Sequence, residues 1–305
     1  YNTEDLFNTV FSRIEYNRLN WKNISAQFGA DFRRDKVSGS KIQDGYAETF
    51  QAAYFSKTEV QITSQLKSQL GIRLPYHSIY DAPITPSFNL HYNKNNTLQY
   101  RASYARGFRA PSVKELFMEF IDFNHNIVGN SNLNAEYSNA LNSSITITPI
   151  KKEQYYLKLD VESSLQFLKD KINLAQIENS TGYTYFNLSD ATYYGINASL
   201  TAKVSHSSNL QIGWNHFITE SSELYDPIVR QNFNFIYNFT SSKYLFGGNI
   251  NVKAKAKSMF QRLEQEVLVN FEQEGYQLVN MNLFKDLQKL DARITLGVKN
   301  LLDVT

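Results

Sequence analysis

The chain has 305 residues, with 31 Lys and Arg against 29 Asp and Glu, which gives a formal net charge of +2 at pH 7. This near-balance argues against a nucleic-acid binder, which normally carries a clear excess of cations on one face. The mean hydropathy is −0.42. Since no uninterrupted apolar stretch approaches the roughly 18 to 20 residues that a membrane helix needs, helical membrane spans are excluded.

The amino-acid composition favours β-structure. The chain contains 20 Tyr, 21 Phe and 2 Trp, while proline is scarce at 6 and cysteine is absent. Because aromatic and β-branched residues favour strands, an all-β protein is the first expectation. The absence of cysteine excludes a disulfide framework, a zinc-cysteine site and a thiol nucleophile. No basic and apolar leader opens the sequence, so we expect a processed chain or the interior of a longer polypeptide.

Alternation of apolar and polar residues is the dominant pattern. In the segment Val60–Leu74 the apolar residues share one parity, and the glutamines with Lys67 and Arg73 share the other. Strand side chains point to opposite faces in turn, so such a segment has one apolar and one polar face. The pattern predicts about fourteen strands. In chain order they lie near residues 5–16, 21–33, 46–55, 60–73, 84–92, 98–106, 139–148, 154–168, 193–204, 209–220, 230–239, 244–257, 275–285 and 290–300.

Tight turns and long connections alternate between the predicted strands. We expect tight polar turns at 17–20, 56–59, 93–97, 149–153, 205–208, 240–243 and 286–289, and longer connections at 34–45, 74–83, 107–138, 169–192, 221–229 and 258–275. Strands of about ten residues joined in this way are typical of an outer-membrane barrel. A water-soluble sandwich is the alternative, but its strands are usually nearer five or six residues. The prediction is therefore an antiparallel transmembrane β-barrel.

Sequence signatures of enzymes are missing. The chain has no GxSxG elbow, no phosphate-binding loop ending in GK[ST], no GxGxxG and no HExxH motif. Its five histidines share no metal-ligand spacing. We therefore expect no catalytic residue and no required cofactor. Lys253, Lys255 and Lys257 lie on the polar parity, where they form either a solvated lumen face or a field that attracts an anionic ligand.

The longest predicted connection, residues 107–138, departs from the alternation. Pro111 fixes φ, while Gly107 and Gly129 permit a tight backbone, so we expect this loop to be ordered. Long ordered loops on a rigid scaffold are where recognition tends to reside.

Two segments of this region carry a specific resemblance. Tyr100–Phe117 reads YRASYARGFRAPSVKELF and Gly129–Ser138 reads GNSNLNAEYS. Together they resemble the paired box of TonB-dependent outer-membrane receptors, written GFRAP-x-x-x-EL and GNP-x-L-x-x-E. Tyr276–Val304, which contains LGVKNLLD, is similar to the last-but-one strand of that family. The matching residues, expected to be structural, are Gly107, Phe108, Arg109, Ala110, Pro111, Glu115, Leu116, Gly129, Asn130, Leu133, Glu136, Gly297, Asn300, Leu301 and Asp303.

The resemblance implies a location in the bacterial outer membrane and a barrel of about 22 strands filled by an N-terminal plug. On this basis we expect residues 1–305 to be one part of the barrel domain, toward its C-terminal end, with the plug, the early strands and the final strand absent. The implied partners are outer-membrane lipid, TonB through the missing N-terminal region, and a small-molecule metal chelate. A surface lipoprotein is a further candidate partner.

The implied function is TonB-energised import of a scarce nutrient too large for porins. An iron chelate is the first candidate, with haem before a siderophore; a cobalamin receptor and a passive porin-type channel are the alternatives. Haem receptors of the family place a histidine between the two boxes, and His125 stands there in this chain. A neutral imidazole is a good axial ligand to haem iron, in which case haem is transported cargo. The structural alternative is a loop histidine hydrogen-bonded to Asp122 or to the backbone.

Other residues of the same loop are candidate ligand contacts. Phe120 and Phe123 are flat apolar rings that can stack on a macrocycle. Asp122 and Asn124 supply polar groups beside His125. The predicted ligand-binding set is therefore His125, Asp122, Asn124, Phe120 and Phe123.

Overall fold

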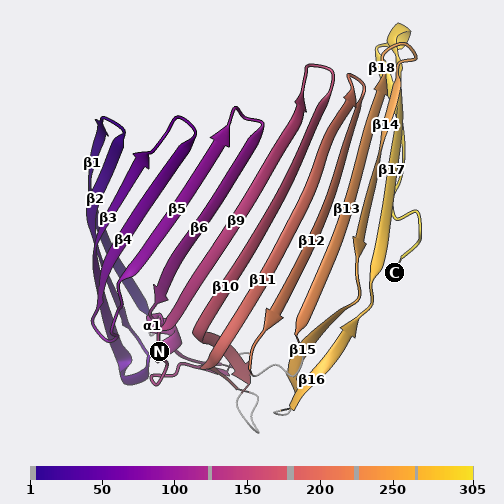
Figure 1. Ribbon diagram of the computed structural model, residues 1–305. Helices are drawn as coiled ribbons and strands as arrows, with labels where there is room; N and C mark the ends of the chain where they lie inside the picture. Colours follow the sequence, from indigo (N-terminus) through magenta and orange to yellow (C-terminus); the bar gives the residue numbers. More distant parts are fainter. Residues whose placement is uncertain (1–4, 123–125, 177–181, 223–226, 265–266, 305) are drawn as a thin grey trace.

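The computed structural model describes residues 5–122, 126–176, 182–222, 227–264 and 267–304. Within them, fourteen strands of the main sheet follow one another in chain order, each antiparallel to the next, from β1 at one end to β18 at the other (Figure 1). These strands are β1 (Leu6–Trp21), β2 (Ile24–Ser38), β3 (Tyr46–Gln61), β4 (Leu66–His77), β5 (Thr85–Lys94), β6 (Leu98–Arg109), β9 (Glu136–Lys151), β10 (Tyr156–Gln176), β11 (Tyr183–Ser205), β12 (Ser208–Glu220), β13 (Ile228–Ser241), β14 (Phe246–Lys255), β17 (Tyr276–Leu287) and β18 (Ala292–Val298).

The smaller elements lie in the connections. They are η1 (Gln43–Gly45), α1 (Val113–Phe117), β7 (Glu119–Ile121), β8 (Asn126–Val128), the hairpin of β15 (Ser258–Glu264) and β16 (Val267–Gln273), and η2 (Gln288–Leu290). β7 pairs with β8, and β8 pairs in parallel with β11. The tight turns gather at one edge of the sheet, while α1 and the hairpin gather at the other, which we call the long-connection edge (Figure 1).

The predicted set of strands is confirmed, although several boundaries move. The turn expected at 56–59 is strand, because β3 continues to Gln61 and the chain reverses at residues 62–65. There the Thr63 hydroxyl accepts hydrogen bonds from the Gln65 and Leu66 backbone amides at 3.2 and 3.1 Å. The connection expected at 169–192 is also mostly strand, since β10 and β11 stay paired as far as Gln176 and Tyr183. Ladder hydrogen bonds extend these strands past the point where the alternation fades.

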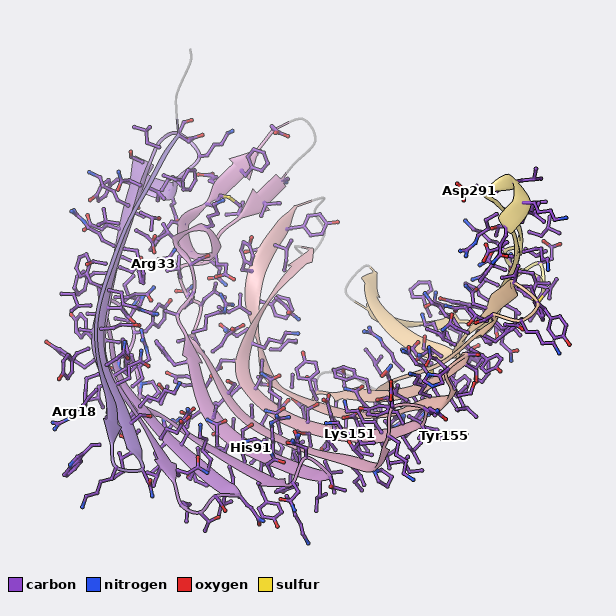
Figure 2. The ribbon with its side chains drawn as sticks, turned by 90° about the horizontal axis from the view of Figure 1, so that it is seen from above. Arg18, Arg33, His91, Lys151, Tyr155 and Asp291 are labelled. Carbon is purple, nitrogen blue, oxygen red and sulfur yellow. The ribbon has the colours of Figure 1, made fainter. Side chains whose placement is uncertain are left out.

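The sheet curves into an open arc (Figure 2). Arg33 lies on its concave side and Arg18 on its convex side. On the concave face, Arg73 of β4 reaches across β3 to donate two hydrogen bonds of 2.7 Å to the buried carboxylate of Asp31 on β2. The side chain between them on β3 is the small, buried Ala53, so the long Arg73 side chain can pass over it to Asp31.

The convex face carries large apolar side chains that have no protein cover. Tyr54 is 72% exposed and Leu70 is 59% exposed. Among the described residues, no helix is long and apolar enough to cross a membrane. The buried core is correspondingly small and lies at the long-connection edge. It consists of two clusters, one of Val37, Ile42, Ala47 and Val113 and one of Leu116, Leu133 and Ile172.

Candidate functional site

The site is built where β6 ends and the chain turns into α1. Pro111 is fully buried and precedes Ser112, the N-cap of α1. The Ser112 hydroxyl accepts a hydrogen bond from the Glu115 amide at 3.3 Å, and the Glu115 carboxylate accepts one from the Ser112 amide at 2.6 Å. This reciprocal capping box satisfies two amides that a helix start otherwise leaves unpaired. It fixes a helix too short to be stable by itself.

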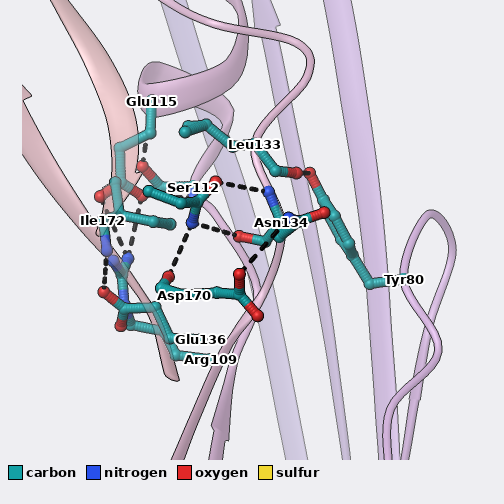
Figure 3. Close-up of polar contacts among 10 residues, drawn as sticks. Tyr80, Arg109, Ser112, Glu115, Leu133, Asn134, Glu136, Asp170 and Ile172 are labelled. Carbon is teal, nitrogen blue, oxygen red and sulfur yellow. Dashed lines mark hydrogen bonds and ion pairs between the residues drawn. The ribbon is translucent and has the colours of Figure 1, made fainter. Parts of the chain in front are cut away.

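Arg109 ties this helix to the sheet (Figure 3). Its guanidinium donates to both carboxylate oxygens of Glu115, at 3.1 and 2.9 Å, and to the carboxylate of Glu136, its cross-strand partner on β9. The other Glu136 oxygen accepts from the Ile172 amide of β10 at 2.7 Å. These contacts form one network, which we call the clamp and which consists of Ser112, Arg109, Glu115, Glu136 and Ile172. It joins β6, α1, β9 and β10.

The charges in the clamp stabilise one another. Burial opposes ionisation of Glu115, but the hydrogen bonds from Arg109 and Ser112 outweigh it and hold the pKa of that carboxyl below its ordinary value. One cation serving two carboxylates leaves the clamp with a net negative charge.

Close packing holds the second half of the loop against α1. Leu116 is 1% exposed and contacts Leu133 and Ile172. A Cβ on Gly129 would lie only 2.7 Å from the Leu116 carbonyl carbon, so the two backbones approach as closely as a glycine permits. The Asn130 amide donates to the Glu115 carbonyl at 2.8 Å.

Several residues that sequence reasoning missed complete the base of the loop (Figure 3). The Tyr80 hydroxyl donates to the Leu133 carbonyl at 2.8 Å, and burial raises the pKa of this tyrosine. The Asn134 amide donates to the Asn187 side chain at 2.8 Å, and that side chain donates to the Asp170 carbonyl at 2.6 Å. The Ser112 cap had a local signal, since Ser-x-x-Glu is the capping-box pattern. Tyr80 and Asn187 had none, because their loop partners, Leu133 and Asn134, are each 53 residues away.

The structure brings together most of the motif residues of the paired box. Eight of them lie in or against the clamp, namely Arg109, Pro111, Glu115, Leu116, Gly129, Asn130, Leu133 and Glu136. Gly107 pairs with Ser138 just before it, and Ala110 connects β6 to Pro111. The Phe108 ring instead packs against Tyr137, with 5.7 Å between ring centroids.

The second motif group lies elsewhere, at the far end of the sheet (Figure 1). Gly297 pairs with Asn282 of β17. Asn300 closes a local turn, since its side chain donates to the Val304 carbonyl at 2.8 Å and its carbonyl accepts from the Asp303 amide at 2.9 Å. The Leu301 amide donates to the Val279 carbonyl at 2.9 Å. This group terminates β18 and does not contribute to the clamp.

Two of the five predicted ligand contacts fall within the described residues. Phe120 lies in β7, and the Lys41 ammonium is 4.9 Å from the centroid of its ring. Asp122 follows directly after β7 and is exposed. Phe123, Asn124 and His125 lie outside the described residues, so the haem-ligand assignment of His125 stays a prediction. Among the described residues, no group of three or more His, Cys, Asp or Glu side chains is arranged to hold a metal ion.

The concave face beyond the clamp is a polar wall. One hollow of about 360 Å³ lies over β5, β6, β9 and β10, and its lining includes Asn89, His91, Arg101, Asn142 and Glu162. Of the predicted lysine series, Lys257 forms an ion pair of 2.7 Å with Glu272 at the β15–β16 hairpin. The wall therefore carries positively charged, negatively charged and neutral hydrogen-bonding side chains.

Known proteins share this arrangement of strands. The family model described as "TonB dependent receptor-like, beta-barrel" matches residues 1–301. No curated protein matches the sequence. A variant of the ferric enterobactin receptor PfeA from Pseudomonas aeruginosa, in complex with enterobactin, is similar in structure, with a TM-score of 0.73 and 15% identity over 98% of this chain and 49% of that chain.

Two further solved structures are similar. The siderophore receptor PirA from Acinetobacter baumannii has a TM-score of 0.72 and 15% identity over 98% of this chain and 51% of its own. The FrpB iron transporter from Neisseria meningitidis has a TM-score of 0.68 and 10% identity, again over 98% of this chain and 51% of its own. The chain thus spans about half the length of each, and at these identities the similarity shows the fold.

Proposed function

The chain belongs to the TonB-dependent receptor β-barrel family, and from this membership we propose that it forms part of the wall of a receptor that imports an iron chelate. Membership also gives the chain its location in the outer membrane of Gram-negative bacteria. We expect the imported chelate to be recognised at the long-connection edge, because loops at that end of outer-membrane barrels face the outside.

The observation that carries the proposal is the clamp. Arg109, Glu115 and Glu136 fix the start and the end of the longest connection to three strands of the wall. A loop held at its base over a polar concave face can present side chains to a ligand without paying the full entropy of ordering on binding. Phe120, the first of the predicted contacts, lies in β7, which follows α1 after one residue.

Energised import is the proposed mode of action. A chelate that is scarce outside must move against its gradient, so the receptor needs energy that the outer membrane itself does not supply. TonB is the proposed partner for this step, contacting a part of the protein outside these residues. We expect no covalent chemistry. A passive porin is the alternative within the outer membrane, and it would give a steady ionic current in planar bilayers where a plugged receptor gives little.

Haem is the first specific ligand candidate and a ferric siderophore the second. His125 supports haem, because imidazole ligates haem iron. A siderophore is supported by the similar structures, which include a ferric enterobactin receptor and a siderophore receptor. A cobalamin receptor is the remaining alternative. Each candidate is a large metal chelate that exceeds porin size.

The test is a titration of the full-length receptor in detergent. Haemin is added while the Soret band is followed, in the wild type, in His125→Ala and in His206→Ala. His206 is exposed in the β11–β12 turn at the opposite edge, so it is the matched control. We expect a saturable Soret shift in the wild type and the control that His125→Ala loses.

A parallel titration follows tryptophan fluorescence with a ferric catecholate siderophore and with cobalamin. Saturable quenching by the siderophore, with no Soret shift on addition of haemin, would identify the ligand as a siderophore instead of haem. It would leave the proposed import of an iron chelate in place. Saturation by cobalamin alone, or by none of the three, would contradict iron-chelate import and leave the family membership intact.

A further inference from the structure

Two cations on the convex face, Arg106 and Lys169, are unpaired among the residues that the structure describes. Arg106 of β6 and Lys169 of β10 are both exposed. Within the residues that the structure describes, neither takes part in a hydrogen bond, an ion pair or a ring contact. An exposed cation in water needs no partner, but a cation on the membrane-facing side of a barrel lies beside lipid.

The register places both side chains on the same face, with one strand between them. Arg106 pairs with Asn139 and Lys169 with Tyr137, and both partners belong to β9. Neighbouring strands are about 4.8 Å apart and residues rise about 3.4 Å along a strand, so the two Cα atoms are about 12 Å apart. Both side chains are long and flexible enough for their charged ends to converge on one group between them.

The surface below these cations is apolar and aromatic. Phe167 is 43% exposed and Leu141 is 46% exposed, on the same face of β10 and β9. The Tyr104 hydroxyl donates to the Asn139 side chain at 2.9 Å. Tyr104 and Leu141 are cross-strand partners two residues below the level of Arg106, which is shared by Phe167. A face that passes in this way from apolar and aromatic residues to cations follows the order from the acyl chains of a bilayer to its headgroups.

The height of the pair on the barrel fits a headgroup. Arg106 is 8 residues after Leu98, the first residue of β6 at the tight-turn edge, and Lys169 lies two residues further along the β9 register. With a strand tilt of about 40°, the two positions lie roughly 20 and 26 Å above the level of Leu98. The apolar band of such barrels is about 25 Å tall, so both cations lie near its outer boundary.

Neighbouring charges on this margin are already engaged. Arg34 donates to Glu48 at 2.7 and 3.0 Å, and the Lys36 ammonium lies 5.2 Å from the centroid of the Tyr46 ring. Asp190 is the cross-strand partner of Lys169, but its carboxylate is held by the Ser222 amide at 2.9 Å and the Ser222 hydroxyl at 2.6 Å. Among the described residues, no carboxylate therefore neutralises Arg106 or Lys169, and both can bind an external anion.

We propose that Arg106 and Lys169 together bind the phosphate group of an anionic lipid in the outer leaflet, whose acyl chains lie along Leu141 and Phe167. The guanidinium donates paired hydrogen bonds to phosphate oxygens, and the ammonium adds a point charge. This inference rests on the outer-membrane location of the chain and is independent of which chelate is imported.

The test measures lipid binding to the purified full-length protein by native mass spectrometry in a neutral detergent. The probes are a phosphate-bearing lipid, a neutral lipid with the same acyl chains, and inorganic phosphate as a competitor. The test variant is Arg106→Gln with Lys169→Gln. The matched control is Arg18→Gln with Lys94→Gln, which removes two exposed cations of the convex face near the tight-turn edge.

We expect saturable binding of the phosphate-bearing lipid that the test variant weakens by about 10- to 30-fold and the control by less than about 2-fold. The neutral lipid should bind the wild type only as weakly as the phosphate-bearing lipid binds the test variant. Equal binding in the test variant and the wild type would overturn the proposal. So would displacement of the lipid by an equimolar amount of inorganic phosphate, because the site would then be a simple anion site. Folding of both variants is checked in gels, where a folded barrel migrates differently before and after heating, as the wild type does.

Discussion

At the scale of the residue, Arg109 decides whether the longest loop has a fixed base. It is the only described cation of the clamp, and it contacts carboxylates on two different elements. A planar guanidinium can serve both carboxylates at once, which a lysine ammonium cannot do with the same geometry. The position therefore depends on the shape of the side chain as well as on its charge.

Arg109→Lys is expected to loosen the loop while the strands stay paired. Loss of the forked hydrogen bonds should lower the local free energy of opening by about 1–3 kcal/mol, because Glu115 and Glu136 then lie close together without full compensation. Hydrogen exchange of the amides of 126–133 in the full-length receptor measures this. Arg293→Lys is the control, since Arg293 forms a comparable fork with Asp286 at the tight-turn edge. If the exchange rate of these amides rose equally in Arg109→Lys and Arg293→Lys, the clamp would not be what holds the loop.

The ionisation of Glu115 makes the same contact dependent on pH. Its pKa is below the ordinary value of 4.5 in the folded protein, so ionised Glu115 stabilises the fold at neutral pH. That stability is fully present above the ordinary value and is lost as the pH falls through the lowered one. The wild type should therefore melt at a higher temperature than Glu115→Gln at pH 7, and the difference should shrink on acidification below about 4.5. A difference in melting temperature that stays constant on acidification would contradict this role of Glu115.

At the scale of the element, α1 shows how a very short helix is held by its surroundings. It has five residues, and two of them, Val113 and Leu116, are buried in different clusters. The capping box closes its start, and the backbone near Gly129 packs directly on its end. The helix is thus a spacer that sets the distance between the two halves of the loop.

Gly129→Ala tests that packing. The added methyl group would meet the Leu116 and Phe117 backbones at 2.7 Å, and backbone cannot rotate away as a side chain can. We expect a loss of about 1–3 kcal/mol of local stability, seen as faster proteolysis of the loop. Gly45→Ala is the comparison, because its Cβ would meet nothing within 4 Å and only its φ of +72° opposes the substitution. A larger effect at position 45 would contradict the role given to Gly129.

At the scale of the whole molecule, the two faces of the arc determine where the protein resides. The convex face exposes residues such as Leu70 and Tyr54, and the concave face joins Asp31 to arginines of two other strands. An apolar exterior with a polar interior is the reverse of a water-soluble protein. It is stable only where lipid covers the outside.

A pair of substitutions one residue apart distinguishes the faces. Leu70→Arg places a charge on the lipid side of β4 and should cost about 2–4 kcal/mol near the middle of the membrane. Gln69→Arg places the same charge on the concave side and should cost much less. The measurement is the fraction of full-length receptor that migrates as folded barrel in unheated gels. Equal folded fractions would show that position 70 does not face lipid.

The strands and their two faces could be predicted from the sequence because side-chain alternation is a local property of each strand, and the family could be predicted from the paired box. The sequence also supplied Arg109, Glu115 and Glu136 through the paired box. It could not give the pairing of these residues in space, the ends of β10 and β11, or the roles of Tyr80 and Asn187. Those depend on ladder hydrogen bonds and on contacts between residues far apart in the chain, which exist only once the strands have paired. Arg106 and Lys169, which are unpaired among the described residues, were likewise recognised as a pair only after the register had placed them on one face.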